Sequence, residues 1–415
     1  MSSVSYKRTR LACYSAYFAM SSVFCVPPLL FLPFRALYGI SYTLLGTLVL
    51  VNFCTQLAID LIFTFFSRYF NAEKMVKIMP LLTSAGLVIY ALAPTLFPAH
   101  AYPGLVAGTL LFSVASGLSE VLLSPTIAAM PSDNPGRDMS LLHSLYAFGV
   151  FTMVVISTLF LRLFGFENWM YLILFLACLP LVCSVLFFIS PFPDMQTAKE
   201  TGAPKHKNNH KIGLLLVVLC IFFGSCAENA MSNWISGYME SALGIDKSLG
   251  DILGVAMFAI LLGIARLTYA KYGKNIGKVL LLGMAGATLC YLIAGLCDIL
   301  PLAFGACVVT GLCTSMLWPG ALIFMEENIP GCGVTAFALM AAGGDLGASV
   351  APQWMGIVID TVSESPLAAE IGAKTGLLPE QLGLKAGMLC TAIFPLIGVV
   401  VVALALRYFK KNPKN

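Results

Sequence analysis

Long apolar stretches recur along the whole chain, and each one is long enough to cross a lipid bilayer as a helix. A membrane-spanning helix needs about 20 predominantly apolar residues. Twelve stretches qualify: residues 11–32, 41–66, 76–96, 104–130, 139–161, 169–189, 212–238, 250–270, 279–299, 301–325, 334–360 and 386–408. The sequence therefore predicts an all-α integral membrane protein with twelve transmembrane helices, embedded in a lipid bilayer.

The composition excludes most other classes of protein. Apolar residues make up 59% of the chain and charged residues 11%, whereas a soluble domain carries about 25% charged residues. This excludes a soluble enzyme, and a disordered chain would need low hydrophobicity. The net charge of 24 − 20 = +4 is scattered along the chain, so no nucleic-acid partner is expected. The sequence has no GxxxxGK[ST] or HExxH motif and no cluster of Cys and His, so we expect no enzymatic activity, no metal and no cofactor beyond coupling protons.

One hydrophilic segment divides the spans into six and six. We expect an N-terminal bundle over 1–190, a linker over 191–211 and a C-terminal bundle over 212–415. When both termini and this linker are placed in the cytoplasm, nineteen Lys and Arg residues lie inside and five outside. Cytoplasmic loops are enriched in Lys and Arg, so the expected location is the cell membrane with both termini cytoplasmic.

The two halves are related by an internal repeat. GLSEVLLSP at 117–125 corresponds to GLCTSMLWP at 311–319, with four identical residues at a constant shift of 194. A Pro-Gly pair follows each segment at nearly the same distance. Parallel six-helix repeats around a central substrate site are a common plan among carriers, so the repeat predicts two pseudo-symmetric bundles.

With its basic central linker, this repeat resembles the major facilitator superfamily. Within that superfamily the chain resembles the fucose-permease-like branch of sugar–proton symporters, through the Glu in GLSEVLLSP, the E-N-A-x-x-N-W segment at 228–234 and the G-D-L-G-x-x-x-x-P-x-x-x-G segment at 344–356. The resemblance implies alternating access by rocking of the two bundles, and a protonatable Glu in the fourth span. The superfamily's loop signature is degraded at 65–74 and 266–275.

Acidic residues inside the spans are the candidates for proton coupling. A charged side chain in mid-bilayer costs at least about 2.5–3.5 kcal/mol, and burial favours the protonated carboxyl. Glu120 shares a helix face with three serines and is the foremost candidate, the alternative being a permanently neutral, hydrogen-bonded Glu. The proton-coupling candidates are Glu120, Glu228 and Asp60, with a structural or gating ion pair equally open for Asp60. The branch's acid in the first helix is missing, and Tyr14 and Tyr17 offer hydroxyls instead.

Span seven carries the residues best suited to a hydroxylated solute. Glu228 is flanked by Ser225, Asn229, Ser232 and Asn233, and Trp234 follows. Amides and a carboxylate beside an aromatic ring suit a sugar, although the same groups could serve only interhelical hydrogen bonding. The candidate substrate-binding residues are Gln56, Asn229, Asn233, Trp234, Trp318, Tyr17 and His143.

Three further residues are candidates for gating: Arg266, Asp345 and Lys271. Arg266 and Asp345 are expected to pair or to close the inner gate. The alternative for Arg266 is that its side chain extends to the lipid headgroups.

The sequence thus predicts a secondary active transporter, functional as a monomer, that couples uptake of a small polar solute to protons. The expected class of solute is a monosaccharide or a polyol. The alternative is proton-coupled efflux of lipophilic or cationic compounds, for which the 11% aromatic content is suitable.

Overall fold

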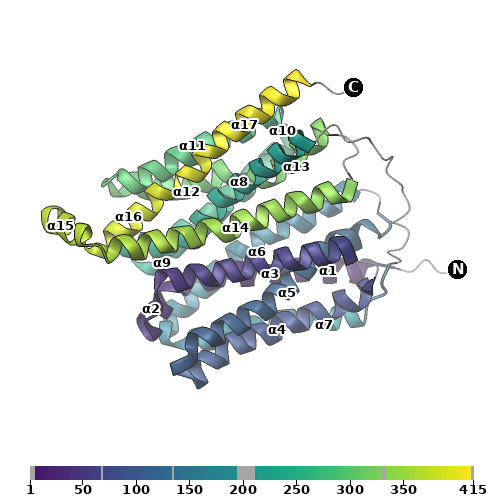
Figure 1. Cartoon of the computed structure of the whole chain (residues 1–415). Helices are drawn as coiled ribbons and strands as arrows, with labels where there is room; N and C mark the ends of the chain where they lie inside the picture. Colours follow the sequence, from purple (N-terminus) through teal and green to yellow (C-terminus); the bar gives the residue numbers. More distant parts are fainter. Residues whose placement is uncertain (1–4, 67–68, 133–134, 194–210, 330–332, 413–415) are drawn as a thin grey trace. The chain divides into compact units, whose positions relative to one another are not determined.

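The computed structural model describes residues 5–66, 69–132, 135–193, 211–329 and 333–412 (Figure 1). Every regular element in these ranges is a helix. Ten helical segments of 21 to 33 residues are long and apolar enough to cross a membrane. Two more long helices, α6 (Pro135–Phe164) and α14 (Gly333–Ser363), occupy the positions of the fifth and eleventh expected spans. The expected all-α fold with twelve transmembrane helices is confirmed, while most of the linker at 191–211 lies outside the described residues.

The chain forms two compact units, and their boundary does not follow the sequence repeat. One unit comprises residues 1–33 and 54–203, and the other comprises 34–53 and 204–415. The helix α3 (Tyr42–Phe66) therefore contributes its first half to the second unit and its second half to the first.

In the first unit, α4 lies along both α5 and α7, and α1 contacts α5, α6 and α7 (Figure 1). Asn71 begins α4 by accepting a hydrogen bond from the backbone N–H of Lys74 at 3.0 Å, as is usual for an N-cap. Besides α6 and half of α3, the helices are α1 (Lys7–Leu29), α4 (Ala72–Leu96), α5 (Ala101–Ala128) and α7 (Trp169–Phe188).

In the second unit, α8 and α14 lie against each other, and α14 also contacts α16. The helices besides α14 and the start of α3 are α2 (Phe31–Tyr38), α8 (Lys211–Gly237), α9 (Lys247–Leu249), α10 (Met257–Tyr272), α11 (Ile276–Leu296), α12 (Leu300–Thr314), α13 (Leu317–Asn328), α15 (Pro366–Thr375), α16 (Pro379–Thr391) and α17 (Ile393–Lys411). The α2 helix begins at the edge of the first unit, and most of it belongs to the second.

Several spans of the second unit are built from more than one helical piece. A π-helical segment extends α8 over Tyr238–Ala242, and another leads into α10 over Gly250–Ala256. The tenth span is interrupted between α12 and α13, and the last span is divided into α16 and α17. The last span therefore begins at Pro379, before the expected position of 386, and α15 fills much of the preceding segment.

Candidate functional site

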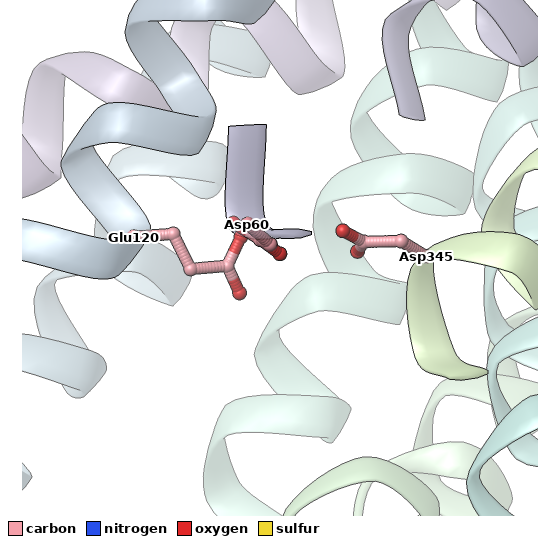
Figure 2. A group of neighbouring side chains, drawn as sticks. All are labelled: Asp60, Glu120 and Asp345. Carbon is pink, nitrogen blue, oxygen red and sulfur yellow. The ribbon is translucent and has the colours of Figure 1, made fainter. Parts of the chain in front are cut away.

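Two carboxyl groups from different helices, one buried and one half-buried, meet within the first unit. Figure 2 shows Asp60 on α3 and Glu120 on α5 pointing toward one another. A carboxylate oxygen of each lies within 4.8 Å of the other. Asp60 is 5% exposed, and Glu120 is half-buried. Two carboxylates this close repel each other when both are ionised.

A glycine allows α5 to approach α3 at this place. A Cβ atom on Gly117 would lie 3.0 Å from the Cβ atom of Ile59 and 3.2 Å from the Cα atom of Gln56. Gly117 is one turn from Glu120, and Gln56 is one turn from Asp60. The close approach of the two backbones thus brings the two carboxyl groups together.

Asn52, Gln56 and Asp60 recur every four residues along α3 and form a buried polar stripe, as a stripe that cannot face lipid should. Asn52 is 7% exposed and Gln56 is 0% exposed. On α1, Tyr17 is 6% exposed, and the Tyr14 hydroxyl donates to the backbone oxygen of Asp138 at 3.4 Å. The side chain of His143, a candidate for substrate binding, lies outside the described residues.

An ion pair joins α10 to α8 in the second unit. Nη2 of Arg266 on α10 lies 3.5 Å from Oε1 of Glu228 on α8, with the two side chains 30% and 20% exposed. Arg266 and Asp345 were expected to pair or to close the inner gate, and the ion pair that Arg266 makes in the structure is with Glu228. Asp345 on α14, also labelled in Figure 2, is 2% exposed.

A proline explains how Arg266 is held. Pro319 has no N–H and cannot bond to the carbonyl four residues earlier in a helix, and that carbonyl belongs to Ser315. The α12 helix ends at Thr314 and α13 starts at Leu317, so the Ser315 carbonyl lies in the break. It accepts a hydrogen bond from Nε of Arg266 at 2.8 Å. The guanidinium therefore bridges a broken helix to the carboxylate of Glu228.

The two amides beside Glu228 are engaged along their own helix. Nδ2 of Asn229 donates to the backbone oxygen and to the hydroxyl of Ser225, both at 3.1 Å. Nδ2 of Asn233 donates to the backbone oxygen of Asn229 at 2.8 Å. Their N–H groups are thus partly used within α8, and Asn229 remains half-buried while Asn233 is 7% exposed.

Both candidate tryptophans make packing contacts within the second unit. Trp234 is 1% exposed, and its indole N–H donates to the backbone oxygen of Pro352 at 3.0 Å. Trp318 is half-buried and lies against Gly344, where an added Cβ atom would be 2.3 Å from the ring. The gating candidate Lys271 is exposed at the end of α10, with Nζ 5.0 Å from the centre of the Tyr272 ring.

A charged network that was not expected from the sequence lies beside the two π-helical segments. Nζ of Lys247 lies 3.5 Å from Oδ2 of Asp251 and 3.6 Å from Oε2 of Glu240. Ser236 donates its hydroxyl to Asp251, which is 1% exposed, and accepts from Lys247 at 3.2 Å. The spacing of four residues between Lys247 and Asp251 could have indicated this ion pair from the sequence. Runs of π-helix are frequent at functional sites.

The internal repeat is visible in the packing of equivalent glycines. Gly311, related to Gly117 by the shift of 194, lies where an added Cβ would be 2.4 Å from the backbone oxygen of Phe258. One glycine thus brings α5 onto α3 and the other brings α12 onto α10. Thr314 occupies the position equivalent to Glu120 and is fully buried. The two halves share a backbone plan but differ in their buried charges.

Comparison with known proteins agrees with this architecture. The chain superposes on a bacterial homologue of the human lysosomal transporter Spinster, in an inward-facing and occupied conformation, with a TM-score of 0.78, 14% identity and 98% of each chain covered. A D-xylose–proton symporter gives a TM-score of 0.73 at 15% identity, with 94% of this chain and 97% of that chain covered. The fucose–proton symporter FucP of E. coli gives 0.59 at 13% identity, with coverage of 97% and 99%. Identities this low show a shared fold.

The family itself is shown by sequence. No curated protein sequence matches the chain. The family model of the Major Facilitator Superfamily matches residues 12–352, most of the chain and parts of both six-helix halves. The protein is therefore a transporter that belongs to the Major Facilitator Superfamily.

Proposed function

We propose that the protein couples uptake of a small polar solute, a monosaccharide or a polyol, to protons. The observation that carries the proton coupling is the pair of Asp60 and Glu120, whose carboxylate oxygens lie within 4.8 Å. One proton bound by the pair removes the repulsion between two neighbouring carboxylates. Release or uptake of this proton would change the charge of the pair by one unit. The carrier would therefore favour one conformation with the proton bound and another without it.

Glu228 pairs with a cation instead of a second acid, and we propose that it binds the solute. Arg266 places a positive charge beside it, so the pair is neutral without a bound proton. A guanidinium and a carboxylate offer donors and acceptors that suit vicinal hydroxyl groups. We therefore assign coupling to Asp60 and Glu120, and we assign solute binding to Glu228, Arg266 and the neighbouring Asn229.

The class of solute is supported by the polar groups along α8 and by two structural neighbours. Those neighbours are described as proton symporters of D-xylose and of fucose. Ser225, Asn229, Ser232 and Asn233 give α8 a run of hydroxyl and amide groups around Glu228. A pocket for lipophilic cations would instead need mainly apolar walls and an uncompensated acid.

The coupling test uses purified protein in proteoliposomes with an imposed pH gradient. Glu120→Gln keeps the size of the side chain but cannot release a proton. We expect it to abolish accumulation of solute against a gradient while exchange of solute continues. The matched control is Glu167→Gln, because Glu167 is exposed. Full accumulation by Glu120→Gln would show that this carboxyl is not the coupling site.

The solute is identified first by thermal shift with D-xylose, fucose, polyols, nucleosides and lipophilic cations. At ten times the Kd, binding stabilises the folded protein by about 1.4 kcal/mol. A shift with one sugar, lost in Asn229→Ala, supports uptake of that sugar. A response to cations alone would replace the proposal with the efflux alternative.

A further inference from the structure

The first turn of α3 is capped by a side chain from α14. Oδ1 of Asp360 accepts a hydrogen bond from the backbone N–H of Tyr42 at 3.2 Å, and Oδ2 accepts one from Thr43 at 2.6 Å. The following N–H, of Leu44, is satisfied by the hydroxyl of Ser41 at 3.2 Å. The first N–H groups of a helix lack partners within it. Here a local serine and a distant aspartate share the capping of α3.

The charge of Asp360 suits this position. The N-terminus of a helix carries a partial positive charge that favours a carboxylate. Both oxygens of Asp360 are used, one for each N–H, so the bonds are charge-assisted and directed. The partners are 318 and 317 residues apart in sequence.

A second acid reinforces the same contact through the Tyr42 side chain. The Tyr42 hydroxyl donates to Glu380 on α16. Arg35 on α2 places its guanidinium carbon 4.3 Å from the centre of the Tyr42 ring, and its Nε lies 3.9 Å from Oε1 of Glu380. The Tyr42 ring is also 5.6 Å from that of Trp234. Tyr42 is thereby 1% exposed.

The backbones come together around these groups. A Cβ atom on Gly46 would lie 3.1 Å from the Cα atom of Gln353, and one on Gly356 would lie 2.6 Å from the backbone oxygen of Tyr42. The start of α3 therefore packs directly on α14. This contact explains why residues 34–53 belong to the second unit although the repeat places them in the first half of the sequence.

We infer that Asp360 and Glu380 form a latch that holds the start of α3 against α14 and α16 and must open for α3 to separate from α14. On the predicted topology this latch lies on the outer side of the membrane, since both termini are expected inside. The inference deepens the proposed function, because alternating access requires one side of the carrier to open and close. The contacts that would resist opening on the outer side are those of Asp360 with the first turn of α3 and of Glu380 with Tyr42.

The test measures exposure of α14 beneath the latch, without any solute. Gln353→Cys serves as the reporter, because Gln353 is half-buried and lies against Gly46. Its rate of reaction with a membrane-impermeant maleimide is measured in right-side-out vesicles. The labelling of the parent chain is subtracted, and labelling after denaturation gives the total.

The decisive variant is Asp360→Asn, and the matched control is Glu364→Gln, an exposed acid one turn further along the chain. Asp360→Asn removes the charge that favours the helix N-terminus and leaves one acceptor oxygen for two N–H groups, so we expect labelling about 5 times faster in this variant, the equivalent of about 1 kcal/mol. Glu364→Gln is expected to label at the parent rate. Tyr42→Phe, which removes only the hydroxyl bonded to Glu380, is expected to give a smaller increase.

Equal labelling of Asp360→Asn, Tyr42→Phe and Glu364→Gln in folded protein would overturn the latch. Folding is checked by the midpoint of thermal unfolding, and Tyr42→Phe keeps the test decisive if Asp360→Asn does not fold. The labelling needs neither sugar nor proton gradient. Failure of the sugar–proton proposal therefore leaves this result unchanged, and failure of the latch leaves the coupling assay unchanged.

Discussion

Arg266 donates a hydrogen bond from Nε to the backbone carbonyl of Ser315, at 2.8 Å, in the break between α12 and α13. The same guanidinium faces Glu228 at 3.5 Å. A lysine in this position could not make both contacts with one planar group. The broken helix and the ion pair are thus parts of one arrangement, which a stability experiment can separate.

The ion pair is tested by a double-mutant cycle. Arg266→Ala is expected to destabilise the protein by about 2 kcal/mol, because it removes a charged hydrogen-bond donor and leaves the carboxylate of Glu228 without its cation. Adding Glu228→Gln to the same chain is expected to restore about 1 kcal/mol. The midpoint of thermal unfolding in detergent measures both. Strictly additive effects would show that the two side chains do not interact.

The pair of Asp60 and Glu120 predicts that neutralising one of the two acids does not destabilise the protein. Glu120→Gln removes the possibility of two negative charges beside each other, so the variant is expected to be at least as stable as the wild type at neutral pH. An increase of the unfolding midpoint by a few degrees is expected wherever the wild-type pair is ionised. Glu167→Gln, at an exposed site, is expected to leave the midpoint unchanged. A clear loss of stability in Glu120→Gln would contradict repulsion within the pair.

Three glycines give a ranked prediction. Gly311→Ala is expected to be the most damaging, since its Cβ would lie 2.4 Å from a backbone oxygen that cannot move aside. Gly117→Ala is expected to cost less, about 1 kcal/mol, because its closest contact is 3.0 Å. Gly305→Ala has open space around it and should gain up to about 1 kcal/mol from the helix propensity of alanine. Unfolding midpoints check the order, and equal effects at all three positions would refute close helix approach as its cause.

The network at the π-helical segments is tested through its cation. Lys247→Met leaves Asp251, which is 1% exposed, with an uncompensated charge, and we expect a loss of about 3 kcal/mol. Lys374→Met is the control, since Lys374 also pairs with an acid four residues away but is 71% exposed, and such surface pairs contribute about 0–1 kcal/mol. Adding Asp251→Asn to Lys247→Met is expected to recover part of the loss. A Lys247→Met variant as stable as Lys374→Met would show that the network does not stabilise the fold.

Much of the fold could be predicted because a bilayer makes a strong demand on sequence. Each span must be an apolar helix about 20 residues long, so twelve apolar stretches were sufficient to predict twelve helices. The resemblance to the family depended on the internal repeat, the basic central linker and the quoted motifs. The internal repeat could be recognised in the sequence because its two halves keep a glycine at equivalent positions. Gly117 and Gly311 each lie where the backbone of a neighbouring helix comes close. The interruption of the tenth span could have been expected from Pro319, which removes a backbone hydrogen bond.

The partners of buried charges could not be predicted in this way. The sequence shows that Arg266 lies in a span and needs a partner, but not that Glu228 and the Ser315 carbonyl provide it. Likewise, Asp360 and Thr43 are 317 residues apart, and no periodicity within one helix relates them. Hydrophobic patterning determines which residues form helices and cross the membrane, because that requirement is local. Which polar groups satisfy one another depends on how those helices pack, and only the tertiary structure decided the pairs Asp60–Glu120, Glu228–Arg266 and Asp360–Thr43.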